Sequence, residues 1–292
     1  MTPQPAILQP IPDHARHLFF DLKRAADPRA ALRALAGACD GASFVLGIGT
    51  GVAEKIGVHP AGLRGFPELP LAKPAIPATQ HALWLWLRGD EPGDLLLRGH
   101  ALQAIAAPAF TQVQAIDSFR YRDSRDLTGY EDGTENPKDE AVVEAAIAQG
   151  QGAGIDGSSF AAVQQWLHDF PAFEAMPRAE QDNCFGRRRD DNEEIDDAPA
   201  SAHVKRTAQE DFEPEAFVVR RSMPWVAGAD SGLVFLAFGE SFDAYEAQLR
   251  RMTGHDDGIS DALFNFTRPL TGGYYGCPPL GAAGVNLQAL GL

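Results

Sequence analysis

The stretch GYEDGTENP, residues 129–137, lies near the middle of the 292-residue chain and separates two segments with the same expected order of helices and strands. Gly129 and Gly133 allow backbone conformations that other residues avoid, and Pro137 ends any preceding helix. Glu131 and Asp132 place two carboxylates between the glycines. The stretch therefore predicts a tight, irregular loop, which is either a solvated acidic turn or part of a functional site.

The residues before this loop predict the order β-α-β-β-α-β. Apolar runs indicate strands at residues 17–22, 43–49, 81–87 and 111–121. One helix is expected to begin after the N-cap pair Asp27-Pro28 and to continue to Ala38, and a second covers residues 94–108. The proline-rich segment 59–77 cannot form regular structure, so we expect it to cover a surface or a sheet edge.

The residues after the loop repeat that order, although no residue-level repeat is visible. Strands are expected at residues 159–166, 216–221, 233–238 and 273–276, and helices at 172–185 and 242–252. Two copies of β-α-β-β-α-β predict an α+β protein with a duplicated ferredoxin-like fold, in which each half has an antiparallel sheet with helices on one face. We expect the halves to be residues 1–140 and 141–292.

Charge and cysteine content limit the partners and the compartment. The formal net charge of -15 argues against nucleic acid or an anionic membrane as a partner, because an acidic chain repels phosphate. Cys39, Cys184 and Cys277 are widely spaced and form no CxxC pair, which is typical of a reducing compartment. The first residues lack a signal-peptide pattern, and no apolar run has bilayer length. We therefore expect a soluble, cytoplasmic protein.

Two of the eight histidines are candidates for chemistry, and the others are expected at exposed or capping positions. His168 follows an expected strand, and His203 lies between a charged segment and another strand. That charged segment, residues 186–215, is long enough to be functional or solvated. Within it, Arg187 follows Gly186 at the end of an expected helix, so it could reach an anionic group of a ligand.

The strand that follows His203 carries two arginines beside valines. In a strand, Arg220 and Ser222 point to one face and Arg221 to the other. A guanidinium among valines is costly to bury unless an anionic group meets it. One of these arginines is therefore expected to face a ligand or a buried acid, and the loop at residues 129–137 offers an acid.

Four segments of the chain resemble the dye-decolourising (DyP-type) haem peroxidases, from about residue 16 to residue 279. GYEDG, residues 129–133, matches the GxxDG signature of that family, and Glu135-Asn136-Pro137 is similar to its bacterial class B members. SAHV at 201–204 resembles the family's proximal-histidine segment, VRRS at 219–222 its distal-arginine strand, and FTRPLTGG at 266–273 its closing segment.

The resemblance implies one haem b per chain, with the iron bound by His203. Asp261 is similar to the acid that accepts a hydrogen bond from the other nitrogen of this histidine. The resemblance also implies catalytic residues on the opposite face of the haem and further residues that contact it. The catalytic candidates are Asp132, Arg220 and Ser222. The cofactor-binding candidates are Glu131, Gly133 and Thr134, with Arg187 and Arg206 for the propionates on position and charge.

The implied function is a peroxidase that reduces hydrogen peroxide and oxidises organic compounds such as dyes and phenols through a high-valent iron-oxo intermediate. Asp132 would move a proton between the peroxide oxygens, and the permanent cation of Arg220 would stabilise the developing charge. Partners would be peroxide and a small organic reductant, and relatives commonly form dimers or larger homo-oligomers. Electrons could leave through aromatic residues, although core packing is favoured for each of them, namely Tyr130, Trp166, Trp225, Tyr274 and Tyr275.

Two alternatives remain open at this point. One is a haem-binding or haem-handling protein, acting in porphyrinogen oxidation or iron release, with incidental peroxidase activity. Cys277-Pro278 resembles a Cys-Pro haem contact, although a buried thiol beside a turn is the favoured interpretation. The other alternative is a ferredoxin-like interaction module without a metal, in which the loop at residues 129–137 is structural.

Overall fold

The computed structural model describes residues 1–69, 72 and 74–292. Its N-terminal half contains an antiparallel sheet in the order β4-β1-β3-β2. The strands are β1 (His14–Leu22), β2 (Phe44–Ile48), β3 (Leu83–Gly89) and β4 (Phe110–Phe119), and the helices are α1 (Arg29–Ala38), α2 (Thr50–Ile56) and α3 (Pro92–Ala106). With α1 between β1 and β2 and α3 between β3 and β4, this half is ferredoxin-like, as predicted.

The C-terminal half repeats the arrangement in the order β10-β5-β8-β7. Its main strands are β5 (Ser159–His168), β6 (Val219–Arg220), β7 (Met223–Ala227), β8 (Asp230–Gly239), β9 (Thr267–Pro269) and β10 (Gly273–Cys277). The helices are α4 (Ala141–Ala146), α5 (Phe170–Ala175), α6 (Arg178–Phe185), α7 (His203–Arg206) and α8 (Asp243–Met252). A short hairpin near the C-terminus pairs β11 (Leu280–Gly281) with β12 (Gly284–Val285). The duplicated α+β fold is confirmed.

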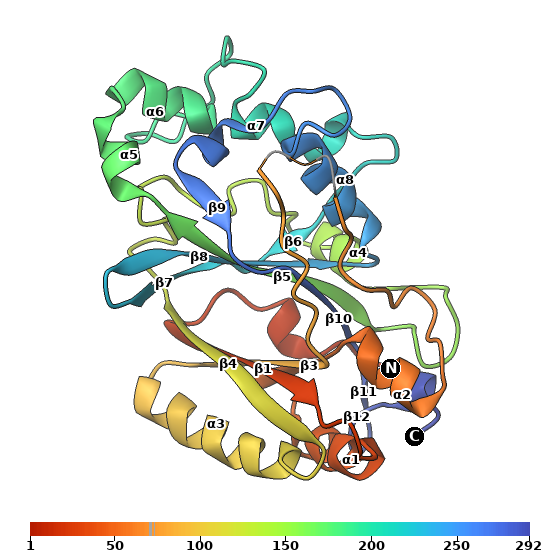
Figure 1. Ribbon diagram of the computed structural model, residues 1–292. Helices are drawn as coiled ribbons and strands as arrows, with labels where there is room; N and C mark the ends of the chain where they lie inside the picture. The colour runs from red at the N-terminus through yellow and green to blue at the C-terminus, as the bar shows by residue number, and fades with distance from the viewer. Residues whose placement is uncertain (70–71, 73) are drawn as a thin grey trace.

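The two sheets join at both edges and close into a barrel. Ser118 of β4 pairs with Trp225 of β7, and Gly276 of β10 pairs with Ile48 of β2. Within the C-terminal half, β5 and β8 pair from Phe160 to Leu167, so eight strands form a closed ring. In Figure 1, α1 and α3 lie outside this ring at the bottom, and α5 to α8 lie outside it at the top.

Separate apolar clusters fill the barrel and the two helix layers. Inside the barrel, Trp84, Trp86 and Phe238 are fully buried. Below it, leucines of α1 and α3 pack on the outer face of the N-terminal sheet. Above it, α8 packs on the outer face of β5 and β8 through Tyr245 and Leu249. The outer face of the C-terminal sheet is therefore covered by helices that leave room for a cavity beside α8.

His17 differs from the expectation of an exposed position, because β1 begins three residues before the predicted strand. His17 therefore lies inside the strand and not at its end. Its side chain points into the barrel, where it is 1% exposed between Trp84 and Trp86. Nε1 of Trp84 donates a hydrogen bond to His17 Nδ1 at 3.3 Å. Burial lowers the pKa of His17 to about 3, so the imidazole is neutral.

Other elements differ from the predictions in their bounds. The predicted helix 172–185 is interrupted at Met176-Pro177, which separates α5 from α6. The predicted strand 216–221 is reduced to β6, and the chain continues as β7 in the same register against β8, an element that was missed. The short α2, α4 and α7 were also missed, because tertiary contacts rather than length support such helices.

The proline-rich segment 59–77 contains no helix or strand among its described residues, and residues 70, 71 and 73 lie outside the described part. Phe66 and Ile76 pack against the same cluster as Tyr274 and Phe242 on the outer face of the C-terminal half. The ring centroids of Phe66 and Tyr274 lie 4.9 Å apart. The segment thus covers a surface, as expected.

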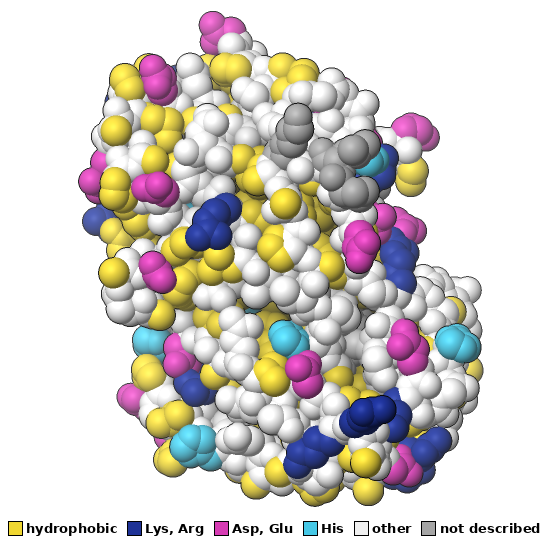
Figure 2. Space-filling model, viewed as in Figure 1, with side chains coloured by type: hydrophobic (Ala, Val, Ile, Leu, Met, Phe, Trp, Pro, Cys, Tyr) yellow, Lys and Arg dark blue, Asp and Glu magenta, His cyan; other side chains and the backbone are white. Residues whose placement is uncertain are grey.

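The surface mixes charges. On the face seen in Figure 2, Lys and Arg side chains lie interspersed with Asp and Glu side chains. Among the described helices, none combines the length and the apolar character needed to cross a lipid bilayer.

Candidate active site

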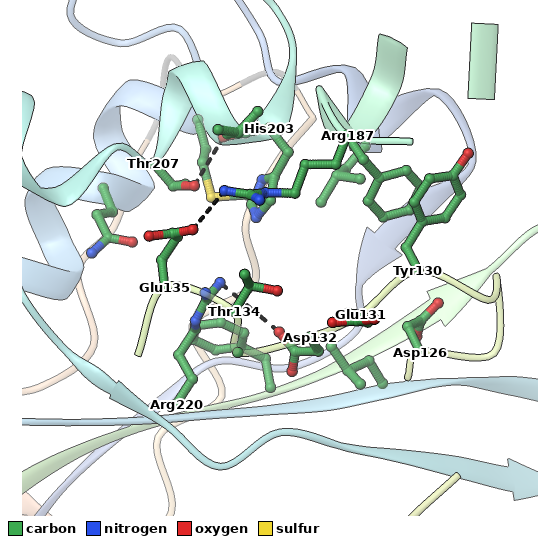
Figure 3. Close-up of a pocket in the computed structure, with 18 of the residues that line it drawn as sticks. Asp126, Tyr130, Glu131, Asp132, Thr134, Glu135, Arg187, His203, Thr207 and Arg220 are labelled. Atoms are coloured by element: carbon green, nitrogen blue, oxygen red, sulfur yellow. Dashed lines mark hydrogen bonds and ion pairs between the residues drawn. The ribbon is translucent and has the colours of Figure 1, made fainter. Parts of the chain in front are cut away.

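A cavity of about 330 Å³ lies between the outer face of the C-terminal sheet and the layer that contains α7 and α8 (Figure 3). Three residues of β5 line it, namely Gln164, Trp166 and His168, because alternate residues of a strand share a face. Apolar side chains form much of the remaining wall, including those of Leu233, Phe235, Leu249, Met252, Leu263 and Phe266. His168 was a candidate from the sequence, whereas Gln164 was missed, although strand periodicity from Trp166 could have found it.

His203, the first residue of α7, lies on one side of the cavity (Figure 3). Its Nδ1 is 2.7 Å from Oδ2 of Asp261, a residue that is 1% exposed. Oδ1 of Asp261 accepts a hydrogen bond from the Leu263 N–H at 2.9 Å, which fixes the carboxylate. A carboxylate at Nδ1 makes that nitrogen the donor, so Nε2 presents its lone pair. Within the described part of the chain, Nε2 has no hydrogen-bond partner.

Asp132 and Arg220 lie on the opposite side of the cavity from His203 (Figure 3). Nη1 of Arg220 is 3.9 Å from Oδ1 of Asp132, which is an ion pair without a hydrogen bond. The two side chains are 15% and 21% exposed, so both are largely shielded from water. An acid and a guanidinium therefore face an imidazole across one cavity.

Asn136 attaches the Asp132 loop to the strand that carries Arg220. Its Oδ1 accepts a hydrogen bond from the Arg220 N–H at 2.7 Å, and its Nδ2 donates to the Arg220 carbonyl at 3.1 Å. Gly133 makes room for this amide, because its φ is 79° and an added Cβ would lie 2.8 Å from Asn136 Nδ2. The role of Asn136 is not visible in the sequence, because its partner Arg220 is distant along the chain.

The other predicted loop residues also line the cavity. Glu131 is held by Arg125 at 2.8 Å and by Nδ2 of Asn192 at 2.9 Å. The same Asn192 amide donates to Oγ1 of Thr134 at 3.0 Å. Part of the charged segment 186–215 therefore packs on the Asp132 loop instead of being fully solvated.

Arg187 lies at the cavity rim, where Figure 3 shows its guanidinium next to Glu135. Nη2 of Arg187 is 2.5 Å from Oε1 of Glu135 and 3.3 Å from Oε2 of Glu194. Lys205 lies at the same rim and pairs with Glu194 at 3.0 Å. The rim thus holds two cations, each with an acidic partner.

Three predicted residues do not line the cavity. Asp261 lies behind His203, whereas Arg206 and Ser222 are engaged elsewhere. Arg206 is 4% exposed and forms a two-point ion pair with Asp257, with both contacts at 2.8 Å, so its guanidinium is occupied away from the cavity. Ser222 is buried, and its hydroxyl oxygen accepts a hydrogen bond from the Leu236 N–H at 3.3 Å. Position in the sequence could not distinguish Arg206 from Arg187, because the partner of each depends on the packing of remote loops.

The remaining candidates are buried. Cys277 is 1% exposed inside the barrel and away from the cavity, which agrees with a buried thiol. The aromatic residues considered for electron exit are at most 7% exposed, in agreement with core packing; they are Tyr130, Trp166, Trp225, Tyr274 and Tyr275. Of these, Tyr130 and Trp166 also line the cavity.

Comparisons with known proteins agree with this geometry. Residues 123–282 match the family model described as Dyp-type peroxidase, C-terminal. A dye-decolorizing peroxidase of Mycolicibacterium paratuberculosis is 32% identical over 244 residues, covering 81% of this chain and 69% of the relative. A crystal structure of a putative dyp-type peroxidase protein from Shewanella oneidensis has a TM-score of 0.87 at 26% identity, covering 97% and 96% of the two chains. A DypB variant from Rhodococcus jostii RHA1 in complex with heme has a TM-score of 0.86 at 26% identity, covering 95% and 96%.

The chain therefore belongs to the DyP-type peroxidase family, and it is a haem-dependent peroxidase. Its residues fit the cofactor: Nε2 of His203 is available as an axial ligand, apolar side chains can contact a porphyrin, and Arg187 and Lys205 could meet its carboxylates. The alternative of an interaction module without a metal is not supported.

Proposed function

We propose that this peroxidase reduces hydrogen peroxide in the cavity between His203 and the Asp132–Arg220 pair, and that it oxidises small organic reductants such as dyes and phenolic compounds. The observation that carries the proposal is the opposition of these groups, with Nδ1 of His203 held at 2.7 Å by the buried Asp261. When bound, haem supplies the electron transfer chemistry for both half-reactions. Glu135-Asn136-Pro137 supports placement in bacterial class B.

The residues opposite His203 handle protons and charge. Asp132 takes a proton from one oxygen of hydrogen peroxide and returns it to the other, so that water can leave. Arg220 stabilises the negative charge that develops on the departing oxygen, because a guanidinium keeps its proton at any working pH. Both side chains are shielded from water, which strengthens these interactions. Ser222 has no assigned step, since its hydroxyl oxygen is engaged with Leu236.

Nε2 of His203 would hold the iron, and Asp261 holds the ring in the required tautomer and raises its basicity. Glu131, Gly133 and Thr134 would contact the haem, and Arg187 would pair with a propionate in place of Glu135. We do not extend this role to Arg206, because its guanidinium is paired with Asp257.

Titration of the protein with haem tests this assignment. The wild-type chain should give a strong Soret band and should oxidise a phenol or an anthraquinone dye only when peroxide is present. His203→Ala should lose or alter that band, whereas the matched variant His59→Ala, at an exposed position, should match the wild type. An unchanged spectrum and full activity in His203→Ala would overturn the assignment.

We also propose a homo-oligomer located in the cytoplasm, built from two halves at residues 1–140 and 141–292. The oligomer is proposed from the family resemblance, because relatives commonly form dimers or larger assemblies. The three cysteines are free and buried, which supports a reducing compartment. Light scattering of the purified protein and cell fractionation test these two points.

A further inference from the structure

A second histidine–carboxylate pair lines the cavity on the side of the Asp132 loop. His168, the last residue of β5, places Nε2 2.9 Å from Oδ2 of Asp126. The two side chains are 6% and 11% exposed, and both residues line the cavity (Figure 3 labels Asp126). The roles proposed above for His203, Asp132 and Arg220 leave this pair unused.

Both ring nitrogens of His168 have partners. Nε2 faces the Asp126 carboxylate, which accepts when it is ionised, so Nε2 is the donor there. Nδ1 lies 2.7 Å from Oγ1 of Thr267, whose hydroxyl also lies 3.0 Å from the Leu167 carbonyl. A hydroxyl can donate or accept, so this end of the ring is satisfied in either case.

The surroundings of Asp126 favour its carboxylate form. Oδ1 of Asp126 accepts hydrogen bonds from both the N–H and the hydroxyl of Thr128, at 2.8 Å and 2.6 Å. Burial alone would raise the pKa of Asp126, but the hydrogen bonds and charge of His168 and the bonds from Thr128 lower it. Asp126 is thus an ionised acceptor for the Nε2–H of His168.

Asp126 also organises the main chain that leads to Asp132. Its N–H donates to the Tyr130 carbonyl at 2.9 Å, and its carbonyl accepts from the Gly129 N–H at 2.8 Å. Among the described residues, the Asp132 side chain has only the 3.9 Å contact with Arg220, and the Asp132 N–H donates to the Ser124 carbonyl at 3.2 Å. The position of the Asp132 carboxylate therefore depends on how the loop is anchored.

We propose that His168 and Asp126 are positioning residues for the peroxide reaction, in which the hydrogen bond from Nε2 of His168 anchors the Asp126 turn to β5 and so holds Asp132 opposite His203. This inference rests on the proposed function, because the role of Asp132 is part of that proposal. His168 and Asp126 act through the loop and do not touch peroxide.

Two substitutions of Asp126 separate anchoring from simple loss of charge. Asp126→Ala removes all acceptors, so peroxide reaction and cyanide association should slow by about 10- to 100-fold, as expected for displacement of a reacting group. Asp126→Asn should stay within about threefold of the wild type, because its amide oxygen can still accept from Thr128 and its N–H can donate to Nε2 of His168 in the other ring tautomer. His168→Leu should resemble Asp126→Ala.

Cyanide association is the readout that does not depend on turnover, because hydrogen cyanide must give its proton to a nearby base as it binds ferric haem. The Soret band should be retained in all three variants. The control is His81→Gln, since His81 forms a similar pair with Asp21 at 2.7 Å but does not line the cavity. Its rates should equal those of the wild type.

Nitrogen-15 NMR of the reduced carbon monoxide complex, which is diamagnetic, tests the contact between His168 and Asp126 directly. Nε2 of His168 should carry a proton in the wild type, and its resonance should shift in Asp126→Asn. An Nε2 without a proton in the wild type, or wild-type peroxide and cyanide rates in both Asp126→Ala and His168→Leu, would overturn the inference. Asp132→Asn separates the two proposals: if it also shows wild-type rates, the proposed function fails; if it is slow, only this inference fails.

Discussion

Asn136 forms two hydrogen bonds with the main chain of Arg220, one as acceptor at 2.7 Å and one as donor at 3.1 Å. The loop that carries Asp132 is thereby attached to the strand that carries Arg220. Because the side chains of Asp132 and Arg220 are 3.9 Å apart, this amide helps to set how they face each other.

Replacing this amide should therefore slow the peroxide reaction without releasing haem. We expect a loss of about 10- to 100-fold for Asn136→Ala, because small displacements of reacting groups are that costly. Asn136→Asp keeps the acceptor and loses the donor, so its rate should lie between those of the wild type and Asn136→Ala. Stopped-flow absorbance measures the rate, with Asn286→Ala as a control outside the cavity. A wild-type rate in Asn136→Ala would show that other contacts hold the loop.

Removal of the proton carrier or the cation should slow the first reaction with peroxide. General acid–base groups contribute about 10² to 10⁴ in rate, so Asp132→Asn and Arg220→Leu should each fall by that order. Stopped-flow traces of both variants show which loss is larger. Asp139→Asn, an exposed carboxylate outside the cavity, is the control. Two unaffected rates would remove both residues from the reaction.

Loss of the buried carboxylate beside His203 should change the reduction potential of the iron without abolishing its binding. In Asp261→Asn the Nδ1–H has only a neutral acceptor, so the imidazole becomes a poorer donor and the iron(III)/iron(II) reduction potential should rise. Metal affinity should fall by about 10- to 100-fold, as for other partners of ligating histidines. A spectroelectrochemical titration measures the potential, with Asp256→Asn as control. An unchanged potential would contradict the role of Asp261.

Gly186 permits the end of α6 to approach α7, so a methyl group there should disturb the iron ligand. Its φ is 81°, and an added Cβ would lie 2.0 Å from Cγ1 of Val204, the neighbour of His203. Gly57 has a φ of 78° but open space, so Gly57→Ala should cost only the backbone strain, about 1–2 kcal/mol in free energy of unfolding.

Gly186→Ala should therefore destabilise the protein more than Gly57→Ala and should also release haem faster. Urea unfolding measures the first effect, and transfer of haem to an excess of a scavenger protein measures the second. The second substitution Val204→Ala should restore part of the loss in Gly186→Ala. Equal effects of the two alanine variants would show that the contact with α7 is unimportant.

His17 should make folding sensitive to acid. Its folded pKa of about 3 is below the usual 6.5, so the unfolded chain binds more protons between these values. The free energy of unfolding should therefore fall as pH falls from about 6.5, by about 1.4 kcal/mol per pH unit at the steepest. Denaturant unfolding at several pH values should show a weaker dependence in His17→Gln than in the wild type. His59→Gln, at an exposed position, should keep the full dependence.

Local patterns were sufficient for most of the fold. The apolar runs of β1, β3, β5 and β8 predicted strands near their observed bounds, and the repeated element order predicted two ferredoxin-like halves. Two elements were predicted wrongly. Pro177 interrupts a predicted helix, and β7, which contains Pro224, was missed although it continues the register of β6. Both errors occurred at a proline, because whether a proline ends an element depends on the elements packed next to it.

Backbone preferences and apolar periodicity in the sequence were enough to predict the irregular loop at residues 129–137 and the two ferredoxin-like halves. Side-chain chemistry made His203 a candidate, whereas the choice of Asp132 and Arg220 came from the resemblance to the family. The contacts of Asn136 with Arg220 and of Arg206 with Asp257, and the orientation of Gln164 and His168 toward the cavity, were visible only in the folded structure. Those contacts join residues far apart in the chain, and they depend on how the closed barrel and its loops pack.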